Sequence, residues 1–568
     1  MTRAADYDKL ALWALIVGAP ILYLSFGYTE MAGSDMWWHV AAGRELVQTG
    51  TVWMVDDWSF TEHGSDWLNH EWLADLVYYG WVSLFGLEAL VYWKWLVVIA
   101  TFTLLQLALA RTSGSHLAAV LCAGSAAAIA APFIDVRPHL YTLLNFCLLL
   151  YLLLGRRANV WLLAPLFVLW VNLHGGFFFG LMALAILIFP WRDFNLSNFR
   201  AALLVGIACV AAAILNPSGL GTFLYPLKYA FDETSPFRSL GEWHPPHKPG
   251  GIRSPLFFYF QWLPLAAALY ALPWVRKKVS VPWEGLCLTA LTLAMALTSR
   301  RFIPIFAISL AVLMAPLMGL LLKQAQGRVV HVVLAFAVLW FALWRQFPYP
   351  LQARPAFHFL IAEFSYPVDL VNFVVRNELQ GKVFAYYNWG GYLHWRTDGD
   401  FKVYIDGRAD TLYDAPTYLN YVAVLRSSSD WLARVEATGA EFMLWPNERA
   451  AGAAKLQEMF DSGRWRGLYQ DADGWLLVRT DVKLPPNLTD PSHTPWRDLT
   501  QSVAAVHARD LRAALRYAQK VRQVQPWNKR ACDIAVGVHR HYGDRQAGES
   551  VLRECRSYFP SRWLPAAF

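Results

Sequence analysis

The sequence predicts a polytopic α-helical membrane protein, and its composition and hydropathy are the observations that predict it. Of the 568 residues, 56% are apolar and only 16% are charged, and the mean hydropathy is +0.30. Soluble domains usually carry about 25% charged residues, so this composition excludes a large soluble enzyme. The 28 tryptophans suit a protein with two membrane interfaces, where amphipathic rings gather. The net charge of +7 is interpreted as an orientation signal rather than a nucleic-acid surface.

About eleven apolar stretches approach the roughly 20 residues that cross a hydrocarbon core. They lie near 10–28, 88–110, 115–133, 140–154, 159–173, 176–191, 199–215, 256–274, 282–299, 302–322 and 329–347. The first is preceded only by residues 2–9 and followed by no small-residue cleavage site, so it predicts an anchor helix rather than a removed signal peptide. Segment 71–85 is interpreted as a helix along the outer interface, because another crossing there would invert every later loop.

The cations in the short loops predict the orientation, because cytoplasmic loops retain Lys and Arg. With a cytoplasmic N-terminus, alternate loops place on the inside Arg111, Arg156 with Arg157, Arg192 with Arg200, the cations of 276–278, and Lys323 with Arg328. The odd number of crossings then makes everything after about Phe347 extracytoplasmic.

Three parts follow from this topology. We expect a membrane domain over 1–350 that includes an outer loop at 29–87, an extracytoplasmic α/β domain over 351–485, and a helical tail over 486–568. The α/β expectation rests on short β-like runs at 382–385, 402–405 and 475–479 between amphipathic segments.

The tail predicts a tetratricopeptide-like helical hairpin. Pro526 and Pro560 are 34 residues apart and each closes a helix, with Gly543 and Asp544 at the intervening turn. Ordinary helical hairpins are the alternative. Two cysteines of the tail, Cys532 and Cys555, could pair if the tail is extracytoplasmic, and the sequence leaves open whether they do. The other four cysteines lie in apolar stretches without CxxC spacing, so a structural zinc site is not expected.

The outer loop at 29–70 is unusually acidic. It holds Asp35, Asp56, Asp57, Glu62 and Asp66, with His39, His63 and His70, and Arg44 is its one cation. Asp35 and His39 are four residues apart and would share one helical face, which can bind a divalent ion or hold a general base. The alternative is an interfacial helix that Trp37 and Trp38 anchor and Asp35 caps.

A second outer acid, Asp135, interrupts two spans together with Arg137 and His139. Ionisable groups at membrane depth are costly and usually face a cavity or a partner. The alternative is that Asp135 pairs with Arg137 or His139 and merely neutralises the turn. Asp35 and Asp135 are therefore the candidate catalytic acids, and they could share a divalent cation such as Mg or Mn, since hard cations prefer oxygen ligands.

Further polar groups are expected on the same outer side. The candidate substrate-binding residues are His39, Arg137, His139, His174, Glu242, His244, Arg300 and Arg301. The adjacent Arg300 and Arg301 suit an anionic lipid phosphate, with snorkelling to phospholipid headgroups as the alternative. The glycines that follow His174 permit close backbone approach.

The order of one span, an acidic outer loop, a second outer acid, many spans and an extracytoplasmic domain resembles the GT-C superfamily of integral-membrane glycosyltransferases. The stretches 34–39, 57–61, 69–73, 135–139, 172–177 and 388–393 resemble a bacterial branch of it. The likeness covers about residues 10 to 480 and leaves the tail as an appendage.

The resemblance implies a sugar donor carried on a polyprenyl phosphate or diphosphate and an extracytoplasmic acceptor that is a glycan, a lipid or a protein. It implies that Asp35 is the catalytic or metal-binding acid, that Asp135 is the second acid, and that Arg300 or Arg301 holds the donor phosphate during an inverting displacement. It also implies a bacterial inner membrane.

The stretch 387–392 lacks the aspartate of the Trp-Trp-Asp-Tyr-Gly motif of oligosaccharyltransferase catalytic subunits, so transfer to asparagine is not expected. The turn formed by Asp406, Gly407 and Arg408 is interpreted as a turn stabilised by an Asp–Arg contact, although it could approach the membrane cavity. Two other functions stay open. One is a non-catalytic scaffold of envelope polysaccharide assembly whose tail binds a protein partner. The other is a transporter, which the clustering of polar groups at one face and the lack of an internal repeat disfavour.

Overall fold

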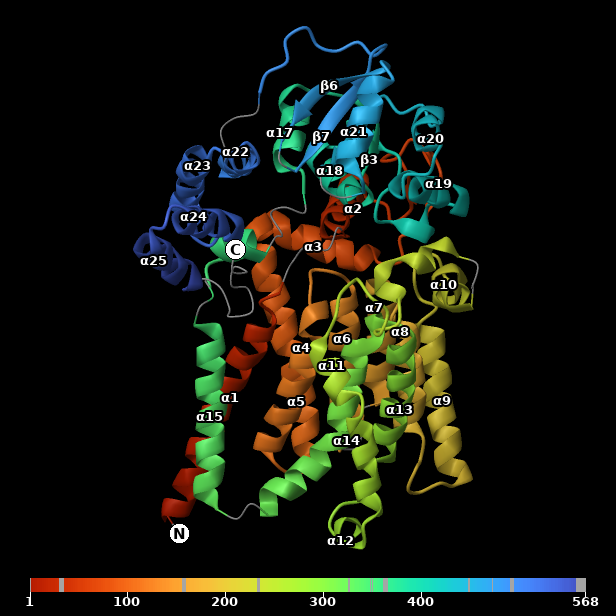
Figure 1. The fold of residues 1–568 in the computed structure, drawn as a ribbon. Coiled ribbons are helices and arrows are strands. Elements are labelled where there is room, and N and C mark those ends of the chain that lie inside the picture. Colours follow the sequence, from red (N-terminus) through yellow and green to blue (C-terminus); the bar gives the residue numbers. More distant parts are fainter. Residues whose placement is uncertain are drawn as a thin grey trace. The chain divides into compact units, whose positions relative to one another are not determined.

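The computed structural model describes residues 2–29, 35–155, 160–231, 235–324, 327–347, 349, 351–360, 366–447, 450–471, 473–490 and 495–557. Ser34, Arg156, Arg157 and Pro560, which the sequence analysis uses, lie outside these residues. The chain forms two compact units, which Figure 1 shows. The membrane unit consists of Met1–Glu30, His70–Ala74 and Val91–Phe347, and the sheet unit of Met31–Asn69, Asp75–Leu90 and Pro348–Phe568.

The membrane unit is built from apolar helices. They are α1 (Thr2–Phe26), α4 (Leu90–Ser113), α5 (His116–Ala130), α6 (His139–Leu153), α7 (Leu163–Leu173), α8 (Phe177–Ile188), α9 (Leu196–Ala212), α10 (Leu220–Phe231), α11 (Pro255–Phe260), α12 (Pro273–Arg276), α13 (Trp283–Thr298), α14 (Ile303–Gln324) and α15 (Arg328–Gln346). Short 3-10 helices join them at Ala131–Phe133 (η2), Val160–Leu162 (η3), Pro236–Ser239 (η4), Gly241–Trp243 (η5), Leu263–Ala271 (η6) and Arg300–Phe302 (η7).

The apolar helices of this unit lie where the sequence predicts spans. Among the residues that the structure describes, five helices are long and apolar enough to cross a membrane, namely Tyr7–Phe26, Leu87–Ser113, His116–Phe133, Arg300–Gln324 and Val329–Gln346. Shorter apolar helices cover the remaining predicted stretches. The protein is therefore a multi-pass membrane protein; the number of crossings stays a prediction.

Packing separates a buried core from a lipid-facing surface. Helix α14 packs on α5 and α13 and is buried along most of its length. Helix α15 lies along α1, where Gly18 permits close approach, since a Cβ there would be 3.0 Å from the Leu339 Cα. Large apolar side chains on α9 and α15 stay exposed, for example Leu204 at 67% and Trp340 at 67%. Such exposed apolar surface suits contact with lipid.

The sheet unit contains a five-stranded mixed sheet in the order β4-β3-β5-β7-β6. The strands are β3 (Gly381–Ala385), β4 (Phe401–Val403), β5 (Phe442–Pro446), β6 (Trp465–Gln470) and β7 (Gly474–Arg479), beside a small antiparallel pair β1 (Met54–Val55) and β2 (Asp66–Trp67). β3 pairs in parallel with β4 and β5, whereas β7 pairs antiparallel with β5 and β6. β5 is buried throughout, as expected of a central strand.

The sheet unit also contains helices. They are α2 (Asp35–Thr49), α3 (Trp72–Phe85, whose first three residues belong to the membrane unit), α16 (Ala353–Leu360), α17 (Val368–Arg376), α18 (Gly390–Thr397), α19 (Ala415–Leu425), α20 (Trp431–Ala437) and α21 (Gly452–Asp461), with 3-10 helices at Leu87–Ala89 (η1), Tyr387–Trp389 (η8) and Ala409–Thr411 (η9). Of these helices, α17, α18 and α21 contact the sheet. The outer loop pairs with the edge strand β4 through a parallel bridge between Ser59 and Val403. Pairing of this kind covers an edge that would otherwise be open.

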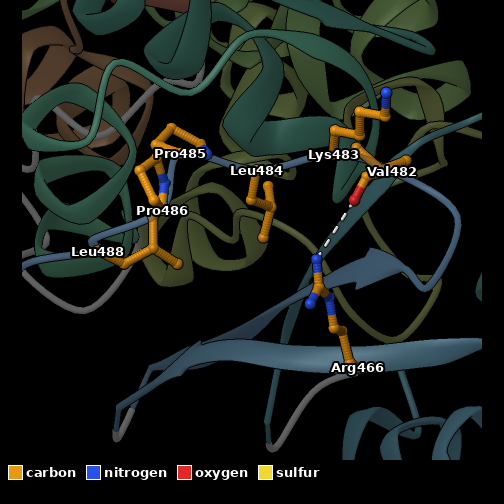
Figure 2. A pocket seen from close by; sticks show the side chains of 7 residues that line it. All are labelled: Arg466, Val482, Lys483, Leu484, Pro485, Pro486 and Leu488. Atoms are coloured by element: carbon orange, nitrogen blue, oxygen red, sulfur yellow. Dashed lines mark hydrogen bonds between the residues drawn. The ribbon is translucent and has the colours of Figure 1, made fainter.

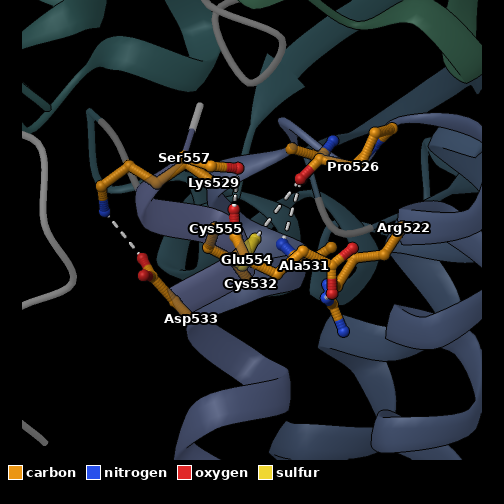
Figure 3. The surroundings of a disulfide bond; sticks show 10 residues. Arg522, Pro526, Lys529, Ala531, Cys532, Asp533, Glu554, Cys555 and Ser557 are labelled. Atoms are coloured by element: carbon orange, nitrogen blue, oxygen red, sulfur yellow. Dashed lines mark hydrogen bonds and ion pairs between the residues drawn. A yellow bond between two sulfur atoms is a disulfide. The ribbon is translucent and has the colours of Figure 1, made fainter. Parts of the chain in front are cut away.

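The tail consists of α22 (Pro495–His507), α23 (Leu511–Val524), α24 (Lys529–His541) and α25 (Arg545–Arg556), and consecutive helices pack on one another. Asp510, Asn528 and Asp544 cap the last three by accepting a backbone N–H. Cys532 and Cys555, whose pairing the sequence leaves open, form a disulfide that joins α24 to α25 (Figure 3). Two helical hairpins result, an arrangement that the tetratricopeptide-like prediction and its alternative share.

Candidate functional site

Seven ionisable side chains gather at loops and helix ends of the membrane unit. This charged cluster consists of Glu71, Asp135, Arg137, His139, His174, Glu242 and Arg301. Five separate segments supply them: the start of α3, the η2–α6 turn with the start of α6, the α7–α8 turn, η5 and η7. Apart from Glu71, the sequence analysis singles out every member.

Asp135 is the carboxylate of the cluster that is best placed for a ligand. Its Oδ1 atom is buried and makes no hydrogen bond to any part of the chain that the structure describes. His139 Nε2 lies 3.5 Å from Oδ1, but this nitrogen donates to the Phe133 carbonyl at 2.7 Å. A buried carboxylate oxygen without a donor is costly, which favours a role in binding.

Two arginines hold Glu242 in place. Arg137 Nη1 donates to Glu242 Oε2 at 2.9 Å, and Arg301 Nη1 donates to Oε1 at 3.1 Å. Burial opposes ionisation of this carboxyl, but Arg137 and Arg301 outweigh it and lower the pKa of Glu242 to about 2. Arg137 and Arg301 thus share Glu242 as a partner, and guanidinium groups held in this way suit an anion such as a phosphate.

The adjacent arginines play different parts. Arg300 is fully buried and donates to the carbonyls of His244, Pro245, Lys248, Gly250 and Ile252. These five acceptors match the five N–H groups of a guanidinium, so Arg300 organises the loop and has no donor left for a phosphate. Arg301 is 31% exposed and also lies over the Trp243 ring, so it is the remaining candidate for the phosphate. The His244 ring contacts Lys248 Nζ at 3.2 Å.

His174 and Glu71 form a second part of the cluster. Gly176 N–H donates to His174 Nδ1 at 2.9 Å, and Thr142 Oγ1 lies 2.7 Å from the same nitrogen. Since Nδ1 accepts, a neutral His174 carries its proton on Nε2, which lies 3.6 Å from Glu71 Oε1. Burial, followed by the charges of Arg301 and other cations, holds the pKa of His174 well below its usual range.

Two stretches of the sequence meet here. Trp72 Nε1 donates to Asn172 Oδ1 at 2.8 Å, so the start of α3 is fixed to the end of α7.

Sequence reasoning missed Glu71 as a site residue, although it stands between His70 and Trp72 in one of the resemblance motifs. It also missed Lys94, which is buried in α4 and donates to the Thr29 carbonyl at 2.6 Å. No local pattern marks that lysine.

Asp35 belongs to the sheet unit. There Gly390, Gly391 and Gly407 allow the stretches 35–39, 388–393 and 406–408 to approach one another closely. A Cβ on Gly407 would lie 3.0 Å from Asp35 Oδ1 and 2.8 Å from Trp38 Nε1. A Cβ on Gly391 would lie 3.0 Å from the Trp38 Cβ, and one on Gly390 would lie 2.6 Å from the Asp406 Cβ. Only glycine allows the backbone to approach this closely. Asp35 is therefore the first residue of a helix that packs against the turn at 406–408.

Three close pairs of ionisable side chains organise the acidic loop and the turn at 406–408. His39 is 1% exposed, and its Nδ1 lies 2.6 Å from Asp75 Oδ1. Arg408 is buried between Asp56, with Nη1 2.6 Å from Oδ1, and Asp406, with Nη2 2.8 Å from Oδ2. The predicted Asp–Arg contact in the turn is present. The structure surrounds His39 with protein, so it positions α2 through Asp75 in this state of the molecule.

A separate pocket of about 550 Å³ lies beside β6 and is lined by Arg466 and residues that follow β7 (Figure 2). Arg466 Nη2 donates to the Val482 carbonyl at 3.2 Å. The lining contains cations but no carboxylate or imidazole, so it offers no acid–base chemistry.

Comparison with known proteins bears on the fold. No family model matches the chain, and no curated relative matches it in sequence. The oligosaccharyltransferase of Archaeoglobus fulgidus in its apo form is similar in structure, with a TM-score of 0.52 and 12% identity, covering 84% of this chain and 75% of that chain. The archaeal oligosaccharyltransferase AglB of Archaeoglobus fulgidus with an inhibitory peptide and a dolichol-phosphate has a TM-score of 0.53 and 11% identity, covering 98% and 87%. The chain has the GT-C fold. ArnT of Cupriavidus metallidurans in the apo state matches with a TM-score of 0.44 and 12% identity, covering 84% and 98%.

Within the GT-C fold of this chain, Asp135 lies in the membrane unit and Asp35 in the sheet unit. Their joint action stays a prediction. Among the residues that the structure describes, no group of three or more His, Cys, Asp or Glu side chains is arranged to hold a metal ion. A metal ion would therefore need ligands from the substrate in addition to any that these residues supply.

Glu242 gives a pH prediction that is independent of activity. Its lowered pKa means that the ion pairs to Arg137 and Arg301 stabilise the fold above the ordinary value of 4.5, and that this contribution is lost as pH falls towards about 2. We expect Glu242→Gln to lower the apparent melting temperature of the purified protein by a constant amount between pH 5 and 7. The difference from wild type should shrink as pH falls below about 4.5. A difference that stays constant to pH 3 would contradict the ion pairs.

Proposed function

We propose that this protein is an integral-membrane glycosyltransferase that moves a sugar from a polyprenyl-phosphate donor to an extracytoplasmic glycan, lipid or protein. The GT-C fold supports glycosyl transfer from a lipid-linked donor. One of the similar structures holds a dolichol-phosphate together with an inhibitory peptide, which supports a lipid-linked donor and a separate acceptor here.

The buried oxygen of Asp135 is the observation that carries this proposal. It lies in a cluster in which Arg137 and Arg301 both bind Glu242. In an inverting displacement, an acceptor hydroxyl oxygen bonds to the anomeric carbon while Asp135 or Asp35 takes its proton. The bond from that carbon to the phosphate oxygen breaks, and the electron pair leaves with the phosphate. Arg301 would stabilise the departing charge.

A divalent cation such as Mg or Mn fits this proposal. The unpartnered Asp135 oxygen is a hard ligand of the kind that such ions prefer. When bound, the ion would supply charge stabilisation at the phosphate. The bound ion, rather than a cation of the protein, would then compensate the negative charge of Asp135.

The location of the protein is part of the proposal. We place it in a bacterial inner membrane with the N-terminus in the cytoplasm and the sheet unit and tail outside. The Cys532–Cys555 disulfide supports this orientation, because disulfides persist in oxidising compartments. The helical tail would contact a protein partner of envelope polysaccharide assembly.

Removing each acid tests the function. We expect Asp35→Asn and Asp135→Asn each to lower the transfer rate from polyprenyl-phosphate sugars by about 100-fold or more, because each removes a carboxylate that acts at the reacting bond. The measurement is sugar transfer by purified protein in detergent, with Mg or Mn added. Asp57→Asn is the matched control, since this acid of the same loop is 61% exposed and should be silent.

The result also separates the alternatives. Full activity in both variants would remove the proposed mechanism. A wild-type protein that binds no donor and transfers no sugar would favour the non-catalytic scaffold.

A further inference from the structure

A second cavity of the membrane unit lies away from the charged cluster, where α4 and α14 end. It has a volume of about 790 Å³ and is lined by the ends of these two helices, by α12 and by the segment that follows α12. Three cations line it, namely Arg111, Lys278 and Lys323, together with the hydroxyl residues Thr112, Ser113 and Ser280. No carboxylate is among its described lining residues.

The cavity has a fixed rim. α14 approaches the end of α4 so closely that a Cβ on Gly319 would lie 2.2 Å from the Ser113 carbonyl oxygen. Tyr270, Val275, Leu313, Leu317 and Leu320 form an apolar core that anchors the α12 segment on α14. The Tyr270 hydroxyl also donates to the Leu313 carbonyl at 2.8 Å. The segment that carries Lys278 is thereby fixed over α14.

The three cations line this space without acidic partners among the described residues. Arg111 Nη1 donates to the Tyr151 carbonyl at 2.6 Å, which orients its guanidinium. Lys323 Nζ lies 3.3 Å from the position of a Cβ on Gly114, and Lys278 Nζ lies 5.0 Å from the Trp274 ring centre. None of the three forms an ion pair within the part of the chain that the structure describes. The preference of cytoplasmic loops for Lys and Arg does not depend on where in a loop the cations lie. It therefore does not explain why three of them line one cavity.

We propose that this cavity binds the phosphate headgroup of an anionic glycerophospholipid at the membrane surface where α4 and α14 end. Three cations and hydroxyl groups suit a phosphate, and basic pockets between membrane helices bind such headgroups. The apolar wall favours a lipid over a soluble phosphate. Trp274 and Leu320 line the cavity, and the neighbouring Leu272 and Leu321 are 47% and 58% exposed, where acyl chains would lie. The site rests on none of the residues proposed for sugar transfer.

The test compares two pairs of neighbouring cations in the full-length protein. Lys278→Gln with Lys323→Gln removes two charges from the cavity. Arg276→Gln with Lys277→Gln removes two exposed charges from the same segment that do not line it. Bound phosphatidylglycerol and phosphatidylcholine are counted by native mass spectrometry across a lipid titration. Because a lysine near an anionic surface contributes about fivefold to binding, we expect the cavity pair to weaken phosphatidylglycerol binding by about tenfold or more.

The control pair should change binding by less than about twofold, and phosphatidylcholine should bind weakly to all proteins. Equal losses in both pairs would overturn the proposal, because they would show a general surface charge effect. Equal binding of the two lipids would overturn it as well. Competition with glycerol phosphate separates the two sources of phosphate. If this soluble compound displaces the lipid at equal concentration, the acyl chains contribute nothing and the lipid assignment is wrong.

Discussion

Arg408→Gln is expected to lower the stability of the sheet unit by about 3–5 kcal/mol, because it leaves the buried Asp56 and Asp406 without their cation. Both carboxylates and the arginine are 0% exposed at the side chain. The guanidinium also lies 4.3 Å from the Trp58 ring centre, so the variant loses packing in addition to charge. The measurement is the apparent melting temperature of the full-length protein in detergent.

Two further variants separate charge from packing. Arg426→Gln removes an exposed arginine of the same unit and should leave the melting temperature within about 1–2 °C of wild type. Adding Asp56→Asn and Asp406→Asn to Arg408→Gln should recover part of the loss, since no unpaired buried charge remains. If the triple variant is less stable than Arg408→Gln alone, the uncompensated carboxylates do not cause the loss.

The same ion pairs connect stability with the candidate site. Asp56 lies in the acidic outer loop, and its Oδ2 accepts the Ser59 hydroxyl at 2.6 Å beside the bridge from that loop to β4. Asp406 and Arg408 flank Gly407, against which Asp35 packs. The acidic residues of the outer loop therefore have two different roles. Asp56 is structural, and Asp35 stays the candidate for chemistry.

Local patterns in the sequence predict much of the fold. Apolar stretches of sufficient length predict the helices of the membrane unit, and three of the five sheet strands lie at the runs near 382, 402 and 475. β5 and β6 lie outside the predicted runs. The prediction of the turn at Asp406 and Arg408 succeeds because the two residues are close in sequence, so their contact needs no long-range information.

The site is harder to predict because its contacts join distant segments. Glu242 and Arg137 are 105 residues apart, and nothing local indicates that one carboxylate accepts from both Arg137 and Arg301. Arg300 and Arg301 are adjacent and identical in type, yet only the folded loop shows that backbone carbonyls occupy the donors of Arg300. Equivalent residues thus acquire different functions from tertiary structure.

Gly176→Ala tests whether the geometry around His174 matters for function. A Cβ there would lie 2.1 Å from Thr142 Oγ1 and 2.8 Å from His174 Nδ1, so the backbone or Thr142 must move. Thr142 is 7% exposed and also accepts the Trp170 indole N–H at 3.1 Å, so it has little freedom to move. We expect a loss of stability of about 1–3 kcal/mol from overpacking and a fall in transfer rate of about 100-fold, because His174 moves relative to Glu71.

Gly175→Ala is the matched control, since a Cβ at that position meets nothing nearer than the His70 ring at 3.6 Å. It should retain stability and most activity. Adding Thr142→Ala to Gly176→Ala removes the two Thr142 atoms that the new methyl group would meet and leaves only His174 Nδ1, so the pair should regain part of the stability. The pair still lacks the Thr142 contact to His174 Nδ1, and activity should stay low. Recovery of activity together with stability would show that Gly176 serves packing alone and that the orientation of His174 has no part in transfer.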